Sequence, residues 1–500
     1  MNIAENLERT ARFFPGNVAV IEDGREITFQ QFNAESSRLA SAFAEAGIQS
    51  GDHVVLCAPN SYAWLATYFG VIKAGAVAVT ISHLTTANEL QQVLVDCRPK
   101  AVLAGDDKVG DFQKLKENGE ALLIINSHGD VSWDDLMDKG DANFKTVDRN
   151  RHDTCAVLFT GGTTGVPKGA LLSHANIQAS LFNVVHFERS SQEDRALCFL
   201  PLNHVFAQIH IMQSMVYCGG GLVLHPSYDL ERTLDSMARH SVTNLYAVPT
   251  VYIRMLEVGK LKERIKTIRY CFSAAASMAT EIVRAWKART GLDIHEAYGM
   301  TESASMVTYN HFYRHVVGSV GTPVNLVEVQ IRDMEGQVQK AGKEGEICIS
   351  GPNITRGYLN NPRETAATIQ EGWLRSGDLG YFDEGGYLFI VDRLKDMIIT
   401  GGENVYPREI EELLYTHPDV LECAVVGLPD KEYGERVAAL IVSQGNNAPD
   451  PQEIRRFLRE HLMGFKVPKE FLLVEDLPKN NAGKLLKRKI KDQYTSKCSQ

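Results

Sequence analysis

Long apolar runs are missing from this sequence, and none approaches the roughly 20 residues that cross a bilayer as a helix. The first residues, Met1–Asn6, lack the basic and then apolar pattern of a secretory signal, and the last five, Ser496–Gln500, match no peroxisomal or prenylation signal. We therefore expect a cytoplasmic protein that makes no stable membrane insertion.

Closely spaced cysteine pairs are also missing. The nine cysteines form no C-x-x-C motif, their number is odd, and most lie in apolar runs, as Cys271 does in Arg269–Phe272. The usual sequence patterns of structural zinc sites and disulfide scaffolds are therefore excluded. Buried free thiols in a reducing compartment explain these cysteines better.

A surplus of basic residues is the third absence. Lys and Arg number 52 against 62 Asp and Glu, which gives a net charge of −10 and a pI near 5.9. A chain that coats nucleic acid or anionic lipid needs the opposite balance, so neither is an expected partner. With 500 residues, of which 44% are hydrophobic, the chain exceeds one ordinary core, and two or more domains are expected.

What is present, from the N-terminus on, is an alternation of helical and strand-like patterns. Helical spacing over 32–47 precedes a strand at 52–57, and a helix through 68–75 precedes a strand at 76–80. Strands alternating with helices of these lengths predict crossover connections and a largely parallel sheet. The pattern resumes with predicted strands at 242–249 and 268–273.

Beyond Val316 the sequence changes to short β segments separated by glycine turns, for example at 346–351 and 385–391. A helix at 408–414 and a strand at 423–426 then predict an α+β region. The predicted fold class is α/β multidomain, with a large N-terminal domain of mainly parallel sheets and helices, a β-rich subdomain at about 316–392, and a small α+β C-terminal domain.

The strongest local signal is the segment Leu158–Gly169, in which an apolar strand runs into a loop of glycines and threonines that ends in a lysine. Glycines let backbone N–H groups approach phosphate oxygens, threonine hydroxyls add donors or a Mg²⁺ ligand, and a lysine supplies charge. A Walker A loop is excluded because Pro167 precedes Lys168 and Gly169 follows it. A flexible surface turn is the alternative. The candidate phosphate-binding residues are Thr160, Gly161, Gly162, Thr163, Thr164, Gly165 and Lys168.

With this loop the sequence resembles the ANL superfamily of adenylate-forming enzymes, although Gly161 stands where serine is more usual. Further segments match that family in order over nearly the whole chain: Pro201–His204, Tyr298–Ser303, Ser376–Gly380, Asp392–Asp396, Gly401–Pro407 and Pro478–Lys484. The resemblance implies a large domain over 1–394 and a small mobile domain over 395–500. It also implies an enzyme that makes an acyl-AMP from ATP and a carboxylic acid, and then passes the acyl group to a phosphopantetheine thiol.

The resemblance implies a role for each matching residue. Glu302 and Thr163 would hold Mg²⁺, Tyr298 would stack on adenine, and Asp378 would bind the ribose hydroxyls. Lys484 would join the substrate carboxylate to the α-phosphate and stabilise the transition state. The remaining expected contacts to ATP come from Ala275, Ala276, Gly299, Thr301 and Arg393. Taken singly, a helix-start glutamate, a turn aspartate and solvated lysines are equally good explanations.

The resemblance further implies that the small domain turns on a hinge at Lys395 and presents two faces in succession. One face brings Lys484 to ATP, and the other brings Gly401 and Gly402 to line a tunnel for the thiol, where a Cβ atom would obstruct it.

The acid and the acceptor are less well specified. The stretch after Leu202 has no aspartate to pair with an amino group, so an uncharged tail is favoured, and His204 would lie beside the carboxylate. A medium- or long-chain fatty acid is the first expectation and an aromatic acid the second.

The acceptor is coenzyme A or an acyl carrier protein. The basic run Lys484–Lys491 could contact either one, unless that run is simply a solvated helix face. A monomer or a homodimer is expected. A luciferase-like oxygenase and a non-catalytic nucleotide-binding relative are the competing functions.

Overall fold

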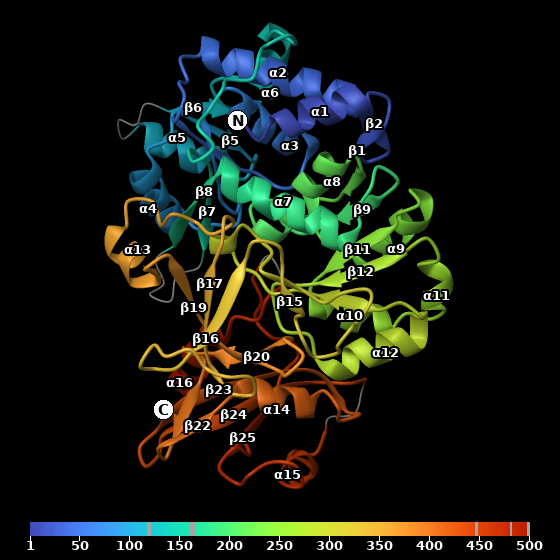
Figure 1. The fold of residues 1–500 in the computed structure, drawn as a ribbon, viewed down its shortest axis with the longest axis vertical. Coiled ribbons are helices and arrows are strands. Elements are labelled where there is room, and N and C mark those ends of the chain that lie inside the picture. The colour runs from blue at the N-terminus through green and yellow to red at the C-terminus, as the bar shows by residue number, and fades with distance from the viewer. Residues whose placement is uncertain (118–121, 161–166, 446–448, 481–482, 498–500) are drawn as a thin grey trace.

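The computed structural model describes residues 1–117, 122–160, 167–445, 449–480 and 483–497 (Figure 1). The large sheets and their helices lie at the N-terminal end of the molecule, a β-rich part lies in the middle, and a separate small domain lies at the C-terminal end. This confirms the predicted α/β multidomain fold. In the described part of the chain no helix is both long and apolar enough to cross a membrane.

The first of the two large sheets has seven strands in the order β13-β12-β11-β9-β10-β1-β2. All its neighbours are parallel except β1 and β2, as the crossover pattern predicted. Its strands are β1 (Val18–Glu22), β2 (Arg25–Thr28), β9 (Arg195–Cys198), β10 (Gly221–Leu224), β11 (Asn244–Ala247), β12 (Tyr270–Ser273) and β13 (Ile294–Glu296).

The second large sheet has six strands in the order β6-β5-β3-β4-β7-β8, of which only β7 and β8 pair antiparallel. Its strands are almost wholly buried, which explains their continuous apolar sequences. They are β3 (His53–Cys57), β4 (Val77–Thr80), β5 (Ala101–Ala104), β6 (Leu123–Ile125), β7 (Thr154–Thr160) and β8 (Lys168–Ser173).

Helices cover both sheets, and α3 is among the most deeply buried, with eleven of its twelve residues buried. Its last residue, Lys73, is fully buried, and its ammonium is compensated by Glu8 at 3.0 Å, Asn33 at 2.8 Å and Ser37 at 3.0 Å. The helices of this part are α1 (Glu5–Phe13), α2 (Phe29–Glu45), α3 (Tyr62–Lys73), α4 (Ala87–Cys97), α5 (Val109–Glu117), α6 (Trp133–Lys139), α7 (His174–Glu188), the π-helix η1 (Phe206–Gln213), α8 (Ser214–Cys218), α9 (Leu230–Arg239), α10 (Pro249–Leu256), α11 (Leu261–Arg264), α12 (Thr280–Thr290) and the 3₁₀ turn η2 (Thr301–Ser303).

The middle part is built on a five-stranded antiparallel sheet, as the short β segments predicted. Its elements, with a flanking strand pair, are β14 (Thr308–Tyr309), β15 (Thr322–Pro323), β16 (Glu328–Arg332), β17 (Gly345–Ser350), α13 (Pro362–Thr368), β18 (Ile369–Gln370), β19 (Trp373–Phe382) and β20 (Leu388–Arg393).

The small domain has its own five-stranded sheet and its own buried clusters, which begin at Ile398, whereas the large clusters end at Leu388. Its elements are β21 (Ile398–Thr400), β22 (Glu403–Val405), α14 (Pro407–Leu414), β23 (Val420–Asp430), β24 (Gly434–Ser443), α15 (Pro451–Arg459), β25 (Glu470–Leu473) and α16 (Lys487–Lys497). The eight cysteines in the described residues are all free thiols, seven of them buried.

Candidate active site

The predicted phosphate loop connects β7 to β8, at the carboxyl end of a strand that is parallel to β4. Thr160 and Lys168 face each other across the hairpin, and the Thr160 hydroxyl donates to the Lys168 carbonyl at 3.4 Å. Gly161, Gly162, Thr163, Thr164 and Gly165 lie outside the described residues. Thr160 and Lys168, which flank the loop, therefore lie at the edge of the sheet where open α/β sheets bind ligands.

Tyr358 connects the loop lysine to the predicted metal ligand. The Tyr358 hydroxyl donates to Glu302 at 2.8 Å, and the Lys168 ammonium lies 5.9 Å from the centre of the Tyr358 ring. Lys168 also pairs with Glu364 of α13. Lys168 and Glu302 are therefore brought to one place. Tyr358 and Glu364 were not predicted, because no local pattern marks a residue whose partner is distant in the sequence.

The motif around Tyr298 meets the motif around Asp378. The Tyr298 hydroxyl donates to Asp378 at 2.7 Å, and Arg393 pairs with the same carboxylate at 3.1 Å. Gly299 is required sterically, since a Cβ atom there would lie 1.4 Å from the carbonyl oxygen of Ser305. Three separate sequence motifs therefore converge on one carboxylate.

The segment after β12 contributes Ala275 and Ala276 to the same region. Ala275 is partly buried and has φ = +70°, a left-handed conformation that costs a residue with a Cβ about 1–2 kcal/mol relative to glycine. Ala276 is exposed.

The charges of Asp378 and Arg393 act on Lys484 of the small domain. Burial, followed by the charges of Arg393 and Lys395, lowers the pKa of Lys484 to about 8. Burial and then the charge of Lys484 lower the pKa of His204 to about 4, so the imidazole is neutral at pH 7. A cation and a neutral imidazole therefore lie close to the Asp378 cluster. Such a pair can hold an anionic carboxylate and leave the anion ionised.

Close contact with the large domain fixes the position of Lys484. The preceding residue, Gly483, has φ = +78°, and a Cβ atom there would lie 2.8 Å from Cγ2 of Val248 and 3.4 Å from Oγ1 of Thr250. Only a glycine allows this approach. The hinge candidate Lys395 is exposed, yet its charge acts on Lys484.

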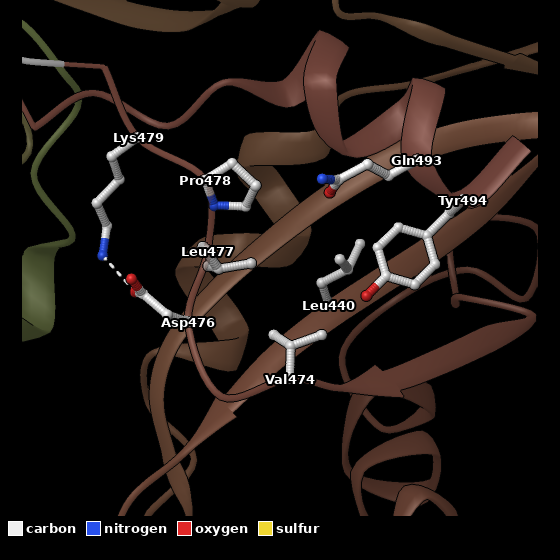
Figure 2. A pocket seen from close by; sticks show the side chains of 8 residues that line it. All are labelled: Leu440, Val474, Asp476, Leu477, Pro478, Lys479, Gln493 and Tyr494. Atoms are coloured by element: carbon white, nitrogen blue, oxygen red, sulfur yellow. Dashed lines mark hydrogen bonds and ion pairs between the residues drawn. The ribbon is translucent and has the colours of Figure 1, made fainter. Parts of the chain in front are cut away.

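Ion pairs within the small domain anchor the two ends of the Lys484 loop. Lys479 pairs with Glu422 at 2.6 Å, and Lys487 pairs with Glu411 at 2.8 Å. A groove of about 410 Å³ lies beside this base, lined by the eight side chains that Figure 2 labels. Lys491 pairs with Glu435. Lys487 and Lys491 of the basic run 484–491 thus make ion pairs within the small domain, while Arg488 and Lys489 are exposed.

Gly401 and Gly402 form the two-residue turn between β21 and β22, where Thr400 pairs with Glu403. Both have positive φ, +61° and +87°, as a tight hairpin turn requires. A Cβ atom at Gly402 would meet nothing within 4 Å. In this arrangement of the domains the turn geometry is therefore sufficient to explain both glycines.

Comparison with known proteins identifies relatives over the full length. The sequence model described as AMP-binding enzyme matches residues 7–359, and that of the AMP-binding enzyme C-terminal domain matches 409–484. A long-chain-fatty-acid–CoA ligase of Bacillus subtilis is 31% identical, with 98% of this chain and 94% of that protein covered. A feruloyl-CoA synthase of Amycolatopsis sp is 32% identical, with 97% and 98% covered.

The crystal structure of the anthranilate CoA ligase AuaEII in complex with anthranoyl-AMP superposes with a TM-score of 0.95, at 27% identity, over 100% of this chain and 98% of that one. Agreement over both full chains at this level means that the small domain here sits on the large one much as it does in that adenylate complex.

Proposed function

The chain belongs to the AMP-binding enzyme family and is an AMP-forming acid–CoA ligase, and from this premise we propose that its acid is a compact aromatic carboxylic acid. The established reaction has two steps: the acid is activated as an adenylate, and its acyl group is then joined to coenzyme A. The proposal concerns which acid enters and which residues act.

The observation that supports an aromatic acid is a buried aromatic wall that begins at Phe206, two residues after His204, where the backbone N–H of Phe206 donates to Nδ1 of His204 at 3.3 Å. The ring centres of Phe206 and His210 lie 5.4 Å apart, those of His210 and Phe272 lie 4.5 Å apart, and those of Phe206 and Phe272 lie 5.7 Å apart. All three side chains are buried. A flat ring can lie against such a wall, whereas a long chain that enters past His204 would have to displace it.

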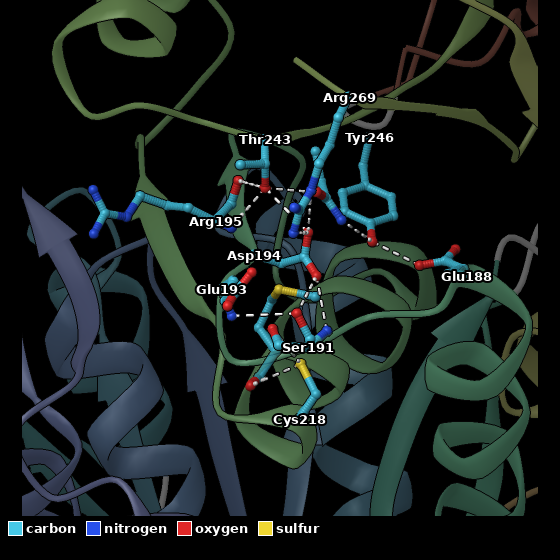
Figure 3. A network of polar contacts seen from close by, with 11 residues as sticks. Glu188, Ser191, Glu193, Asp194, Arg195, Cys218, Thr243, Tyr246 and Arg269 are labelled. Atoms are coloured by element: carbon cyan, nitrogen blue, oxygen red, sulfur yellow. Dashed lines mark hydrogen bonds and ion pairs between the residues drawn. The ribbon is translucent and has the colours of Figure 1, made fainter. Parts of the chain in front are cut away.

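Hydrogen bonds to polar side chains hold His210, one of the three rings of this wall, in place. The Tyr246 hydroxyl donates to Glu188 at 2.6 Å (Figure 3), and the other Glu188 oxygen lies 2.6 Å from Nε2 of His210. Nδ1 of His210 lies 3.0 Å from the Ser305 hydroxyl. Because breaking a buried polar network leaves unpaired groups, these contacts resist movement of His210.

A fatty acid is the second candidate, and the observation in its favour is the likeness to the Bacillus subtilis ligase. At 31% identity over nearly all of both chains, this relative is as similar as the feruloyl-CoA synthase. A fatty chain would require Phe206 or Phe272 to change rotamer on binding.

We propose that the small domain begins at residue 395 and that Lys484 is the main catalytic group of the first step. Its ammonium would hold the substrate carboxylate and the α-phosphate together and stabilise the charge that develops between them. Neutral His204 would position the ionised carboxylate by donating a hydrogen bond from its ring N–H. Release of pyrophosphate then leaves the adenylate in the site.

The nucleotide would be held by the cluster around Asp378. Its carboxylate suits the two ribose hydroxyls, and Arg393 pairs with it and can also reach the phosphates. Tyr298 would stack on adenine, with Gly299, Thr301, Ala275 and Ala276 around it. The phosphates would lie against Thr160, Lys168 and the glycines and threonines at 161–165.

Glu302 fits a Mg²⁺ ion, since it offers a hard carboxylate oxygen, and Thr163 is the second proposed ligand. Bound there, Mg²⁺ would neutralise charge on the ATP phosphates. For the second step we propose that the small domain turns at Lys395, withdraws Lys484, and brings Gly401 and Gly402 beside the incoming thiol.

Pyrophosphate release across a panel of acids tests the substrate proposal. We expect benzoate, hydroxybenzoates and hydroxycinnamates to show at least about tenfold higher kcat/KM than octanoate, decanoate and palmitate, because about 1.4 kcal/mol of differential packing gives that ratio. Phe272→Ala should move the preference toward longer acids, while the exposed control Phe182→Ala should leave it unchanged. Equal or higher kcat/KM for the fatty acids would overturn the proposal. Measuring acyl-thioester formation with coenzyme A, and then with a carrier protein that bears a free phosphopantetheine thiol, identifies the acceptor.

A further inference from the structure

Helix α12 begins without a cap of its own. Its N-cap residue is Ala279, which has no side-chain oxygen to accept from the first N–H groups of the helix. Instead, the backbone N–H of Thr280, the first residue of α12, donates to Oε2 of Glu412 at 3.1 Å. Glu412 belongs to α14 of the small domain, and the two helices lie next to each other in Figure 1. The small domain therefore supplies the missing cap across the domain contact.

The charge of Glu412 suits this position. The N-terminus of a helix carries a partial positive charge, and a hydrogen bond from an N–H to a carboxylate is stronger than one to a neutral acceptor. The side chain of Glu412 is 29% exposed, so solvent and salt screen the contact only in part. The bond should therefore stabilise the docked arrangement of the two domains.

Helix α14 is capped in the opposite direction. Its N-cap residue, Tyr406, makes no side-chain cap and Pro407 has no N–H, so the first N–H of the helix is that of Arg408. This N–H donates to Oδ2 of Asp392 at 3.0 Å, near the end of β20 in the large domain. The Arg408 guanidinium lies 3.5 Å from Glu412. Each domain thus caps a helix of the other, and Arg408 connects the two caps.

A turn of the small domain at Lys395 would affect the two caps differently. Asp392 is only three residues before Lys395, so the chain itself keeps Asp392 near α14. The bond between Thr280 and Glu412 joins residues that are 132 positions apart, and it exists only while α14 lies against α12. The Glu412 cap is therefore specific to the docked arrangement.

We propose that Glu412 is a positioning residue for the first half-reaction, which caps α12 and so holds the small domain in the arrangement that brings Lys484 to ATP. The proposal rests on the proposed movement of the small domain. Glu412 hydrogen-bonds to Thr280 and Arg408, and it acts on the reaction only through the position of its domain. Losing this cap should slow adenylate formation and should not slow transfer to coenzyme A, which follows the turn.

The test measures docking in AMP-bound protein by single-molecule energy transfer. Donor and acceptor dyes are placed through unnatural amino acids at the exposed positions Met334 and Met463, one in each domain. We expect Glu412→Ala to lower the ratio of docked to undocked molecules by about tenfold, and Glu412→Gln, which keeps a neutral acceptor, by about threefold. The matched control is Glu409→Gln on the same helix. Because Glu409 pairs with Lys466 inside the small domain at 2.7 Å, the ratio should stay within about twofold of wild type.

Removing the donor tests the same bond from the other domain, and it decides the question if Glu412→Ala does not fold. Thr280→Pro deletes the N–H that Glu412 accepts, and proline is well tolerated at the first position of a helix. Ala279 has ψ = 134°, the extended conformation favoured before a proline. Thr280→Pro should therefore lower docking about as much as Glu412→Ala, whereas Thr280→Ala, which keeps the N–H, should not. Because both changes remove one bond, the double variant Thr280→Pro/Glu412→Ala should dock as well as either single variant.

The two half-reactions provide a second readout. Single-turnover adenylate formation should slow more in Glu412→Ala than in Glu412→Gln, while transfer from synthetic acyl-AMP to coenzyme A should not slow in either. Two populations in wild type whose ratio is unchanged in Glu412→Ala and in Thr280→Pro would overturn the proposal. A single population in wild type, both with AMP and with AMP plus coenzyme A, would refute the domain movement and the proposal with it. Docking involves neither acid nor turnover, so an incorrect substrate assignment would not affect this result.

Discussion

Replacing Gly483 by alanine tests how closely the catalytic loop must approach the large domain. The new Cβ atom would lie 2.8 Å from Cγ2 of Val248, a separation that real Cβ atoms essentially never show. Because Val248 is buried, this steric clash must be relieved by movement of the Lys484 loop away from the large domain. Overpacking of this kind costs about 1–3 kcal/mol, which predicts a loss of about 5-fold to 150-fold in adenylate formation.

The assay separates this effect from damage to the loop itself. Single-turnover adenylate formation is measured by quenched flow, and transfer from synthetic acyl-AMP to coenzyme A is measured separately. Transfer should change by less than about threefold, because the Lys484 loop is withdrawn from Val248 in the proposed second step. Gly445→Ala is the matched control, because Gly445 also has a positive φ, +69°, in the small domain but meets nothing within 4 Å.

A compensating substitution makes the prediction sharper. Val248→Ala removes the atom that the new Cβ meets, so the double variant Gly483→Ala/Val248→Ala should recover most of the adenylation rate of Val248→Ala. If Gly445→Ala were as harmful as Gly483→Ala, or if Val248→Ala gave no recovery, the contact would not be what holds Lys484 in place.

Three further outcomes follow from the described contacts. Asp378→Asn should raise KM for ATP by about tenfold or more, which steady-state kinetics check. A hydrogen bond to a charged group contributes about 1.5–3 kcal/mol, and Arg393 also loses its counter-charge. Ala275→Gly should raise the free energy of unfolding by about 0.5–1 kcal/mol, because relief of the backbone strain at φ = +70° outweighs the extra conformational entropy of glycine in the unfolded chain. Thermal and urea unfolding measure this change, and a decrease would contradict the strain argument. In an NMR titration the Lys484 ammonium should titrate near pH 8 and move upward in Arg393→Ala, since that cation lowers the pKa of Lys484; an unchanged midpoint would show that burial alone sets it.

Much of the fold was predictable because its signals are local. The predicted helix at 408–414 is α14 (Pro407–Leu414), and the predicted strand at 268–273 is β12 (Tyr270–Ser273), shorter by two residues at its start. The residues of each motif could be named for the same reason, since motifs are contiguous. Tyr298, Asp378 and Arg393 were all named, and the structure brings them together.

The remaining contacts depend on partners that are distant in the sequence. Nothing near Tyr358 in the sequence indicates that its hydroxyl binds Glu302. The motif Pro478–Lys484 contains Gly483, but only the structure shows that Val248 of the other domain leaves no room for a Cβ atom there. Such contacts arise from the packing of distant segments, so they cannot be predicted from a single sequence.

The aromatic wall that begins at Phe206 shows the same limit for substrate choice. From the sequence, a fatty acid is the first expectation and an aromatic acid the second, because no aspartate follows Leu202 to pair with an amino group. In the folded chain Phe206, His210 and Phe272 stack on one another, and a buried carboxylate, Glu188, holds His210. The shape of that wall was set by side chains from three elements, and composition alone could not reveal it.

The most direct test of the central claim is single-turnover kinetics of Lys484→Ala with the best acid of the panel. Loss of one preorganised charge at the reacting centre should slow adenylate formation by about 100-fold to 1,000-fold, while transfer from synthetic acyl-AMP to coenzyme A stays within about threefold of wild type. The exposed neighbour Lys489→Ala should match wild type in both steps. If Lys484→Ala formed the adenylate at the wild-type rate, or if both steps slowed equally, Lys484 would not be the group that drives the first half-reaction.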